Sequence, residues 1–119
     1  MGDGEALIRE VWRRWNEGDR VYNPELLDPE IEWSTPHPDA SAIHGREEVV
    51  AFLRRYVGAF RDFRIELEEI GDLGDHRVMA RFSESGRGKA SGAETHLRAT
   101  AIWTVRDGKA VALRAQTDP

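Results

Sequence analysis

The spacing of apolar residues predicts helices in the first half of the chain. An amphipathic helix is predicted over residues 4–16, from apolar residues that recur every three or four positions: Leu7, Ile8, Val11, Trp12 and Trp15. A second stripe of this kind predicts a long helix over residues 46–60. Between them, Asn23-Pro24 is typical of a helix start and predicts a short helix that Pro29 ends.

The apolar period changes to two after the long helix, which indicates strands. Strands are predicted over residues 63–68, 77–85, 94–106 and 110–117, in addition to a short strand over 31–34 that precedes the long helix. The dipeptide Asp107-Gly108 favours a tight hairpin between the last two. Helices followed by antiparallel strands are typical of an α+β fold. We therefore expect three helices packed on one face of a curved, mostly antiparallel sheet, with a pocket between the layers.

Composition restricts the number of domains, the cellular compartment and the classes of partner, but it does not define an activity. The 119 residues suit one domain spanning 1–119, and 39% hydrophobic residues are enough for a packed core. The chain has no cysteine, which fits a reducing compartment, and its N-terminal segment is unlike a signal peptide, so we expect a cytoplasmic protein. A net charge of −5 disfavours nucleic acid as a partner, and no apolar run is long enough to span a membrane.

Five segments in order resemble the SnoaL-like branch of the NTF2-like superfamily. They are residues 15–19 (WNEGD), 27–33 (LDPEIEW), 44–53 (HGREEVVAFL), 60–63 (FRDF) and 102–109 (IWTVRDGK). The resemblance implies a cone-shaped domain with an open-ended apolar pocket, a homodimer paired through its sheets, and no metal or organic cofactor. Relatives include polyketide cyclases, ketosteroid isomerases, limonene epoxide hydrolases and non-catalytic binding domains, so the fold alone does not define a reaction.

The resemblance also places inert residues where related enzymes keep their catalytic groups. The three groups of ketosteroid isomerases fall on Val11, Trp33 and Ala101, none of which can move a proton or stabilise an enolate, so isomerase activity is not expected. The Arg-x-Asp pair of limonene epoxide hydrolases falls on Arg81 and Ser83, which keeps only the arginine. The acidic position on the last strand, shared with the cyclases, falls on Ala115.

The remaining candidates for chemistry are few. His37 and Asp39 lie in the loop after the first strand, where a histidine beside a carboxylate could act as a general base, although a solvated loop is the plainer interpretation. Arg81 is the best charged candidate inside the cone. The four histidines lack any recognised ligand spacing, so no metal site is predicted.

Five residues are predicted to line one cavity: Trp33, Tyr56, Phe60, Arg81 and Trp103. With Arg81 as its only permanent charge, this cavity would take an apolar or anionic small molecule. The alternative is that Phe82 faces inward and Arg81 faces solvent, because a strand shows only one of these sets to a given side. The leading functional hypothesis is a small-molecule-binding protein. A cyclase, isomerase or hydrolase is the second hypothesis, and a non-catalytic dimerisation module is the third.

Overall fold

A computed structural model describes residues 3–17, 24–37 and 40–118. The elements follow in the order α1 (Asp3–Asn16), η1 (Pro24–Leu26), β1 (Leu27–Ser34), β2 (Ile43–His44), α2 (Arg46–Gly58), β3 (Phe60–Gly74), β4 (Arg77–Gly88), β5 (Glu94–Arg106) and β6 (Lys109–Thr117). The predicted α+β class is confirmed, with two α-helices and one short 3₁₀ helix in place of three helices. Asp39 lies outside the described residues.

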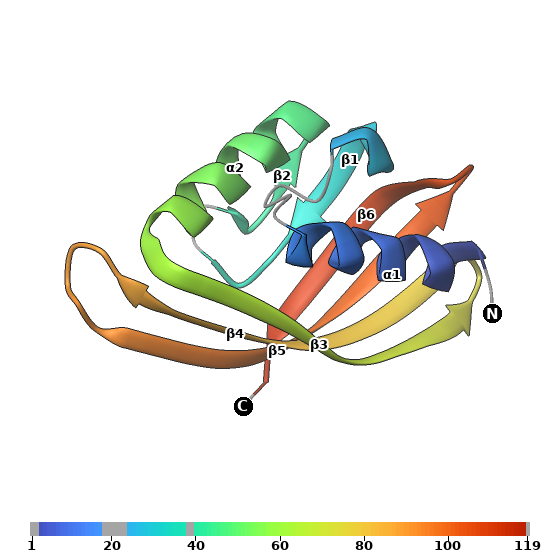
Figure 1. Cartoon of the computed structure of the whole chain (residues 1–119). Coiled ribbons are helices and arrows are strands. Elements are labelled where there is room, and N and C mark those ends of the chain that lie inside the picture. The colour runs from blue at the N-terminus through green and yellow to red at the C-terminus, as the bar shows by residue number, and fades with distance from the viewer. Residues whose placement is uncertain (1–2, 18–23, 38–39, 119) are drawn as a thin grey trace.

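The six strands form one sheet in the order β2-β1-β6-β5-β4-β3. Every neighbouring pair is antiparallel except β1 and β6, which run parallel. Both α-helices lie on the inner side of the curved sheet (Figure 1), so the apolar core forms between the helices and that face. The register of β3 against β4 shifts at three places along the pair. Such shifts bend and twist a strand, and they therefore contribute to the curvature of the sheet.

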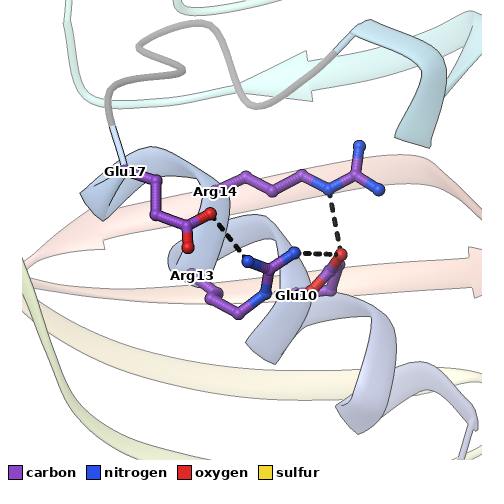
Figure 2. A network of polar contacts seen from close by, with 4 residues as sticks. All are labelled: Glu10, Arg13, Arg14 and Glu17. Atoms are coloured by element: carbon purple, nitrogen blue, oxygen red, sulfur yellow. Dashed lines mark hydrogen bonds and ion pairs between the residues drawn. The ribbon is translucent and has the colours of Figure 1, made fainter.

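The helix α1 is divided into an apolar face and a charged face. Ile8, Val11 and Trp15 are at most 1% exposed and pack into the core. The outer face carries a network of ion pairs (Figure 2), in which the Arg13 guanidinium donates to both Glu10 and Glu17, at 2.6–2.7 Å. Arg14 also donates to Glu10, at 2.9 Å. The hydrogen bonds from Arg13 and Arg14 lower the pKa of Glu10 to about 2. Because this face is charged and solvated, it fixes which side of the helix is buried.

The first strand is longer than its sequence pattern indicates. Leu27 belongs to β1 rather than to the preceding helix, and Pro29 lies inside the strand instead of only ending a helix. The register between β1 and β6 shifts between Leu27 and Glu32. Proline lacks a backbone N–H and is tolerated within a sheet at such an irregularity. Ile43 and His44, predicted at the end of a loop and before the long helix, instead form a two-residue strand against β1.

Candidate functional site

A cavity of about 260 Å³ lies between the helices and the inner face of the sheet. Its helical wall consists of Trp12 and Trp15 from α1, together with Phe52, Leu53 and Tyr56 from α2. The sheet contributes residues from every strand except the short β2, and the loop after β1 contributes Thr35, Pro36 and His37. The cavity therefore occupies the position that the sequence predicted for a pocket.

Tryptophan and phenylalanine rings make up much of the cavity wall. Trp103 meets the ring of Trp33 edge to face with centroids 5.7 Å apart, and that of Trp12 at 6.4 Å. Trp12 also lies 5.6 Å from Phe82 of β4. Tilted and edge-to-face contacts of this kind are favourable. The wall is therefore a closely packed, largely apolar surface.

A row of small residues across the sheet leaves the space in front of these rings. Ala80, Ala101 and Ala115 are direct neighbours on β4, β5 and β6. Ala99 lies two residues before Ala101 and therefore faces the same side. The expectation that Ala99, Ala101 and Trp103 share the inner face is confirmed. Methyl groups at these positions cannot fill the concavity, which explains why the cavity exists.

One end of the cavity carries ionisable side chains. Glu84 of β4 and Tyr56 of α2 line it together and share a side-chain hydrogen bond, in which the phenol donates to the carboxylate. His37 lies beside them, with its ring 5.6 Å from that of Tyr56 and 5.2 Å from that of Phe52. The neighbours of Glu84 on the adjoining strands are Ile65 and Leu97, which are both apolar and line the same cavity.

Burial perturbs both members of the Glu84–Tyr56 pair. Desolvation raises the pKa of Glu84 above its ordinary value of 4.5, and the hydrogen bond from Tyr56 opposes part of that rise. Desolvation also raises the pKa of Tyr56, and the negative charge of Glu84 adds to the effect. The Tyr56 phenol therefore stays protonated and available as a donor at neutral pH.

Replacement of Glu84 by glutamine is expected to change the pH dependence of stability. Because the pKa of Glu84 is raised in the folded chain, its contribution to stability is fully present below about pH 4.5 and is lost as the pH rises through the folded pKa. Glutamine keeps an acceptor for Tyr56 and does not ionise. The free energy of unfolding of Glu84→Gln relative to the parent should therefore rise with pH above 4.5 and then level off, as measured by urea denaturation from pH 4 to 8.

The matched control is Glu66→Gln. Glu66 is exposed on the neighbouring strand β3, one residue after Ile65, and its substitution removes the same charge from the opposite face of the sheet. Its stability difference from the parent should show no comparable rise. The prediction is wrong if the Glu84→Gln and parent curves run parallel throughout this pH range.

Three of the five residues predicted to line the cavity do so, namely Trp33, Tyr56 and Trp103. Phe60 does not line the cavity. It lies beside it, where its ring contacts those of Tyr56 and Phe63 at 5.5 and 5.6 Å, and it covers Gly86 at a distance that leaves little room for a Cβ. Phe60 begins β3 rather than ending α2, and this change of element moves its side chain out of the helical stripe.

The prediction that Arg81 lines the cavity is wrong. Its side chain is 48% exposed on the outer face of β4, 3.3 Å from Asp118 and 3.9 Å from Glu69. Phe82 faces inward instead, together with Val78 and Ala80. The strand thus follows the alternative that the sequence left open, and the cavity contains no permanent positive charge among its described lining residues.

Glu84 was missed because Arg81 was assigned to the inner face. Val78, Ala80, Phe82 and Glu84 share one face at the strand period of two, so the same alternation that excludes Arg81 places Glu84 inside. This alternation is visible in the sequence, but it identifies Glu84 as a cavity residue only once the inward face of β4 is known.

The other candidate groups are only partly brought together. His37 lies in the cavity wall, whereas its proposed partner Asp39 is outside the described residues. His44 is 63% exposed and lies 3.0 Å from Glu30. Within residues 3–17, 24–37 and 40–118, no group of three or more histidine, aspartate or glutamate side chains is arranged to hold a metal ion. No helix in those ranges is both long and apolar enough to cross a membrane.

Comparison with protein families and solved structures gives a consistent result. The sequence pattern of the SnoaL-like domain family matches residues 8–113. Similar solved structures include an NTF2-like protein from Burkholderia thailandensis, with 22% identity over 99% of this chain and 92% of that one and a TM-score of 0.87. A putative polyketide cyclase from Xanthomonas campestris has 20% identity over 98% and 90% of the two chains and a TM-score of 0.77. TerC, co-crystallised with polyporic acid, has 20% identity over 98% and 92% and a TM-score of 0.80. No curated protein gives a significant match by sequence.

Proposed function

Because this chain belongs to the family of SnoaL-like domains, we propose that it binds a ring-sized, largely apolar small molecule in the cavity beneath its two helices. The observation that carries the proposal is a cavity of about 260 Å³ with packed aromatic walls. Cavities of this kind, apolar with a few polar groups at one end, are typical small-molecule sites. Of the five residues that the sequence predicted to line the cavity, Trp33, Tyr56 and Trp103 are the proposed ligand contacts.

The shape of the cavity favours binding over the two rival functions. A purely structural module is expected to fill its core with Trp33, Trp103 and Tyr56, whereas these side chains border an open space. An enzyme would need a group that moves a proton, and Arg81 cannot serve because it lies outside the cavity. Among the described lining residues, His37 and Glu84 carry the kinds of side chain that most often serve as general bases, so a cyclase, isomerase or hydrolase would have to use these. Solved neighbours support a small ring-containing ligand, since one is a putative polyketide cyclase and another was co-crystallised with polyporic acid.

Calorimetric titration with naphthylmethanol tests the proposal. This neutral two-ring alcohol matches the aromatic walls and has one hydroxyl for the polar end. We expect saturable binding at one site per chain, accompanied by a change in tryptophan fluorescence because Trp33 and Trp103 border the cavity. Absence of saturable binding of both naphthylmethanol and its amine analogue would contradict the proposed function.

A second part of the proposal is that two copies of the chain pair through the outer face of the sheet. Thr100, Ile102 and Thr104 of β5 point away from the cavity, and the described helices lie on the opposite side. A groove on this face is lined by Ile102 and Thr104 together with Ala112 and Arg114 of β6. Partly apolar, uncovered faces of this kind suit a two-fold interface. We also place the protein in the cytoplasm, in keeping with its lack of cysteine.

Light scattering coupled to gel filtration is expected to give twice the chain mass of 13.5 kDa at micromolar concentration. Ile102→Arg should shift the protein toward the monomer by placing a charge in the lining of the groove. Leu73→Arg, at an exposed position near the end of β3, is the control and should leave the dimer intact. A parent protein that is monomeric under these conditions would contradict this part of the proposal.

A further inference from the structure

The described lining of the cavity contains a negatively charged group and no permanent positive charge. Of its described lining residues, only His37, Tyr56 and Glu84 are ionisable, and none is lysine or arginine. Among the described lining residues, Glu84 is thus the one carboxylate, in a wall made mainly of aromatic and aliphatic groups. A site of this composition repels anions and favours a ligand that brings its own hydrogen-bond donors or positive charge.

The surroundings of Glu84 leave part of its carboxylate open to a ligand. Ile65 and Leu97 flank it on the neighbouring strands, and neither offers a polar side chain. Tyr56 supplies one hydrogen bond. A carboxylate has about four acceptor positions, so one phenol leaves room for the two or three N–H groups that a ligand could supply. A half-buried carboxylate in apolar surroundings gains most from a partner that also neutralises its charge.

We propose that this polar end is a subsite for a protonated amine carried on an aromatic or alicyclic ring system, with Glu84 as the counter-ion. The inference rests on the proposed binding function and specifies its ligand class. Aromatic side chains also line the cavity beside Glu84: the ring of Tyr56 lies 5.7 Å from that of Phe52 and 5.8 Å from that of Phe63, centroid to centroid. The faces of such rings attract cations within about 6 Å. The ring system of the ligand would lie toward Trp33 and Trp103, beside the small residues of the sheet.

This subsite replaces the anionic ligand expected from the sequence. That expectation depended on the Arg81 guanidinium inside the cavity, and Arg81 instead pairs with Asp118 on the outer face. With the guanidinium outside and Glu84 inside, the sign of the charge facing the ligand is reversed.

Binding of the amine should be coupled to the ionisation of Glu84. Burial raises the pKa of this carboxyl, and a bound cation stabilises its charged form, so amine binding releases a proton wherever free Glu84 is still protonated. Affinity for the amine should therefore increase as the pH rises through the pKa of Glu84 in the free protein. Of the residues that the structure describes, the other ionisable groups facing this site are Tyr56 from α2 and His37 from the loop after β1, while β3 and β5 present Ile65 and Leu97.

Three probes that share one ring system test the inference by calorimetry: naphthylmethylamine, naphthylmethanol and naphthoate. At pH 7 the parent should bind the amine about 10- to 100-fold more tightly than the alcohol, the range expected for a hydrogen bond between charged groups. Naphthoate should bind more weakly than either. In Glu84→Gln the preference for the amine over the alcohol should be lost, so that the two probes bind with similar affinity. Glu66→Gln, which removes an exposed carboxylate from β3, should keep the preference for the amine.

The outcomes separate this inference from the proposed function. If the alcohol binds to the parent as tightly as the amine, or if Glu84→Gln keeps the preference for the amine, the counter-ion role of Glu84 is overturned while small-molecule binding stands. If none of the three probes binds, the proposed function fails and the inference fails with it. Binding of the alcohol to Glu84→Gln also reports that the variant is folded, so a lost preference cannot be confused with a lost structure.

Discussion

Trp103→Ala is expected to lower the free energy of unfolding by about 3–5 kcal/mol, the range for truncation of a fully buried large aromatic side chain. Trp103 is 0% exposed and contacts the rings of both Trp12 and Trp33. It therefore connects α1, β1 and β5 across the core, and its removal enlarges an existing cavity instead of letting the core collapse. A loss of this size is a large share of the 5–15 kcal/mol that typically stabilises a domain. Urea denaturation followed by circular dichroism measures it.

Two further variants make this measurement specific. Trp103→Phe keeps a ring in the core and should lose much less stability than the alanine variant. Leu73→Ala truncates a side chain that is 46% exposed, and it should change the free energy of unfolding by less than about 0.5 kcal/mol. A loss of less than 1 kcal/mol in Trp103→Ala would mean that the tryptophan contacts contribute little to the core.

Ala101→Phe is expected to abolish naphthylmethanol binding while leaving a folded protein. The Ala101 methyl group is 0% exposed and lies in the cavity wall, between Ala80 and Ala115 on the neighbouring strands. A phenyl ring at this position would extend into the space proposed for the ligand. Affinity should fall at least tenfold, equivalent to about 1.4 kcal/mol of binding free energy. Calorimetry gives the affinity, and a thermal melt shows that the fold survives.

A second substitution, which blocks the same cavity from another strand, tests whether the loss of binding in Ala101→Phe is only a local packing effect at that position. Ala115→Phe approaches from β6 and should also remove binding. Ala51→Phe adds an identical ring on the exposed surface of α2 and should leave affinity unchanged. If Ala101→Phe and Ala115→Phe both fold and bind naphthylmethanol as the parent does, the ligand site lies elsewhere on the protein.

The sequence alone was sufficient for the class of fold and for several faces of its elements. The helical spacing from Leu7 to Trp15 predicted the extent and buried side of α1 closely, because only one face of this helix is apolar. The alternation on β5 likewise placed Ala99, Ala101 and Trp103 inward. In both cases the two faces differ strongly in polarity, so burial has one favourable solution.

The face of β4 was decided by tertiary structure. Arg81 and Glu84 are both charged and lie near apolar residues on the same strand. The local sequence pattern therefore does not decide which of the two side chains is buried. The antiparallel register pairs Phe82 with Ala99 and Glu84 with Leu97, both of which face inward on β5. Neighbours in register share a face, so Glu84 lies in the cavity. Arg81 lies on the outer face, where it pairs with Asp118.

The composition of the site likewise depended on contacts between distant parts of the chain. The sequence determined that a helix would carry Tyr56 over a sheet with small residues at its centre, since those facts follow from local periodicity and from the β5 alternation. Only the packing of α2 across the bent strands brings the Tyr56 phenol to the Glu84 carboxylate, which lies 28 positions further along the chain. A hydrogen bond between side chains so far apart leaves no periodic trace in either segment, because periodicity reports which face of one element is buried and carries no information about what that face meets.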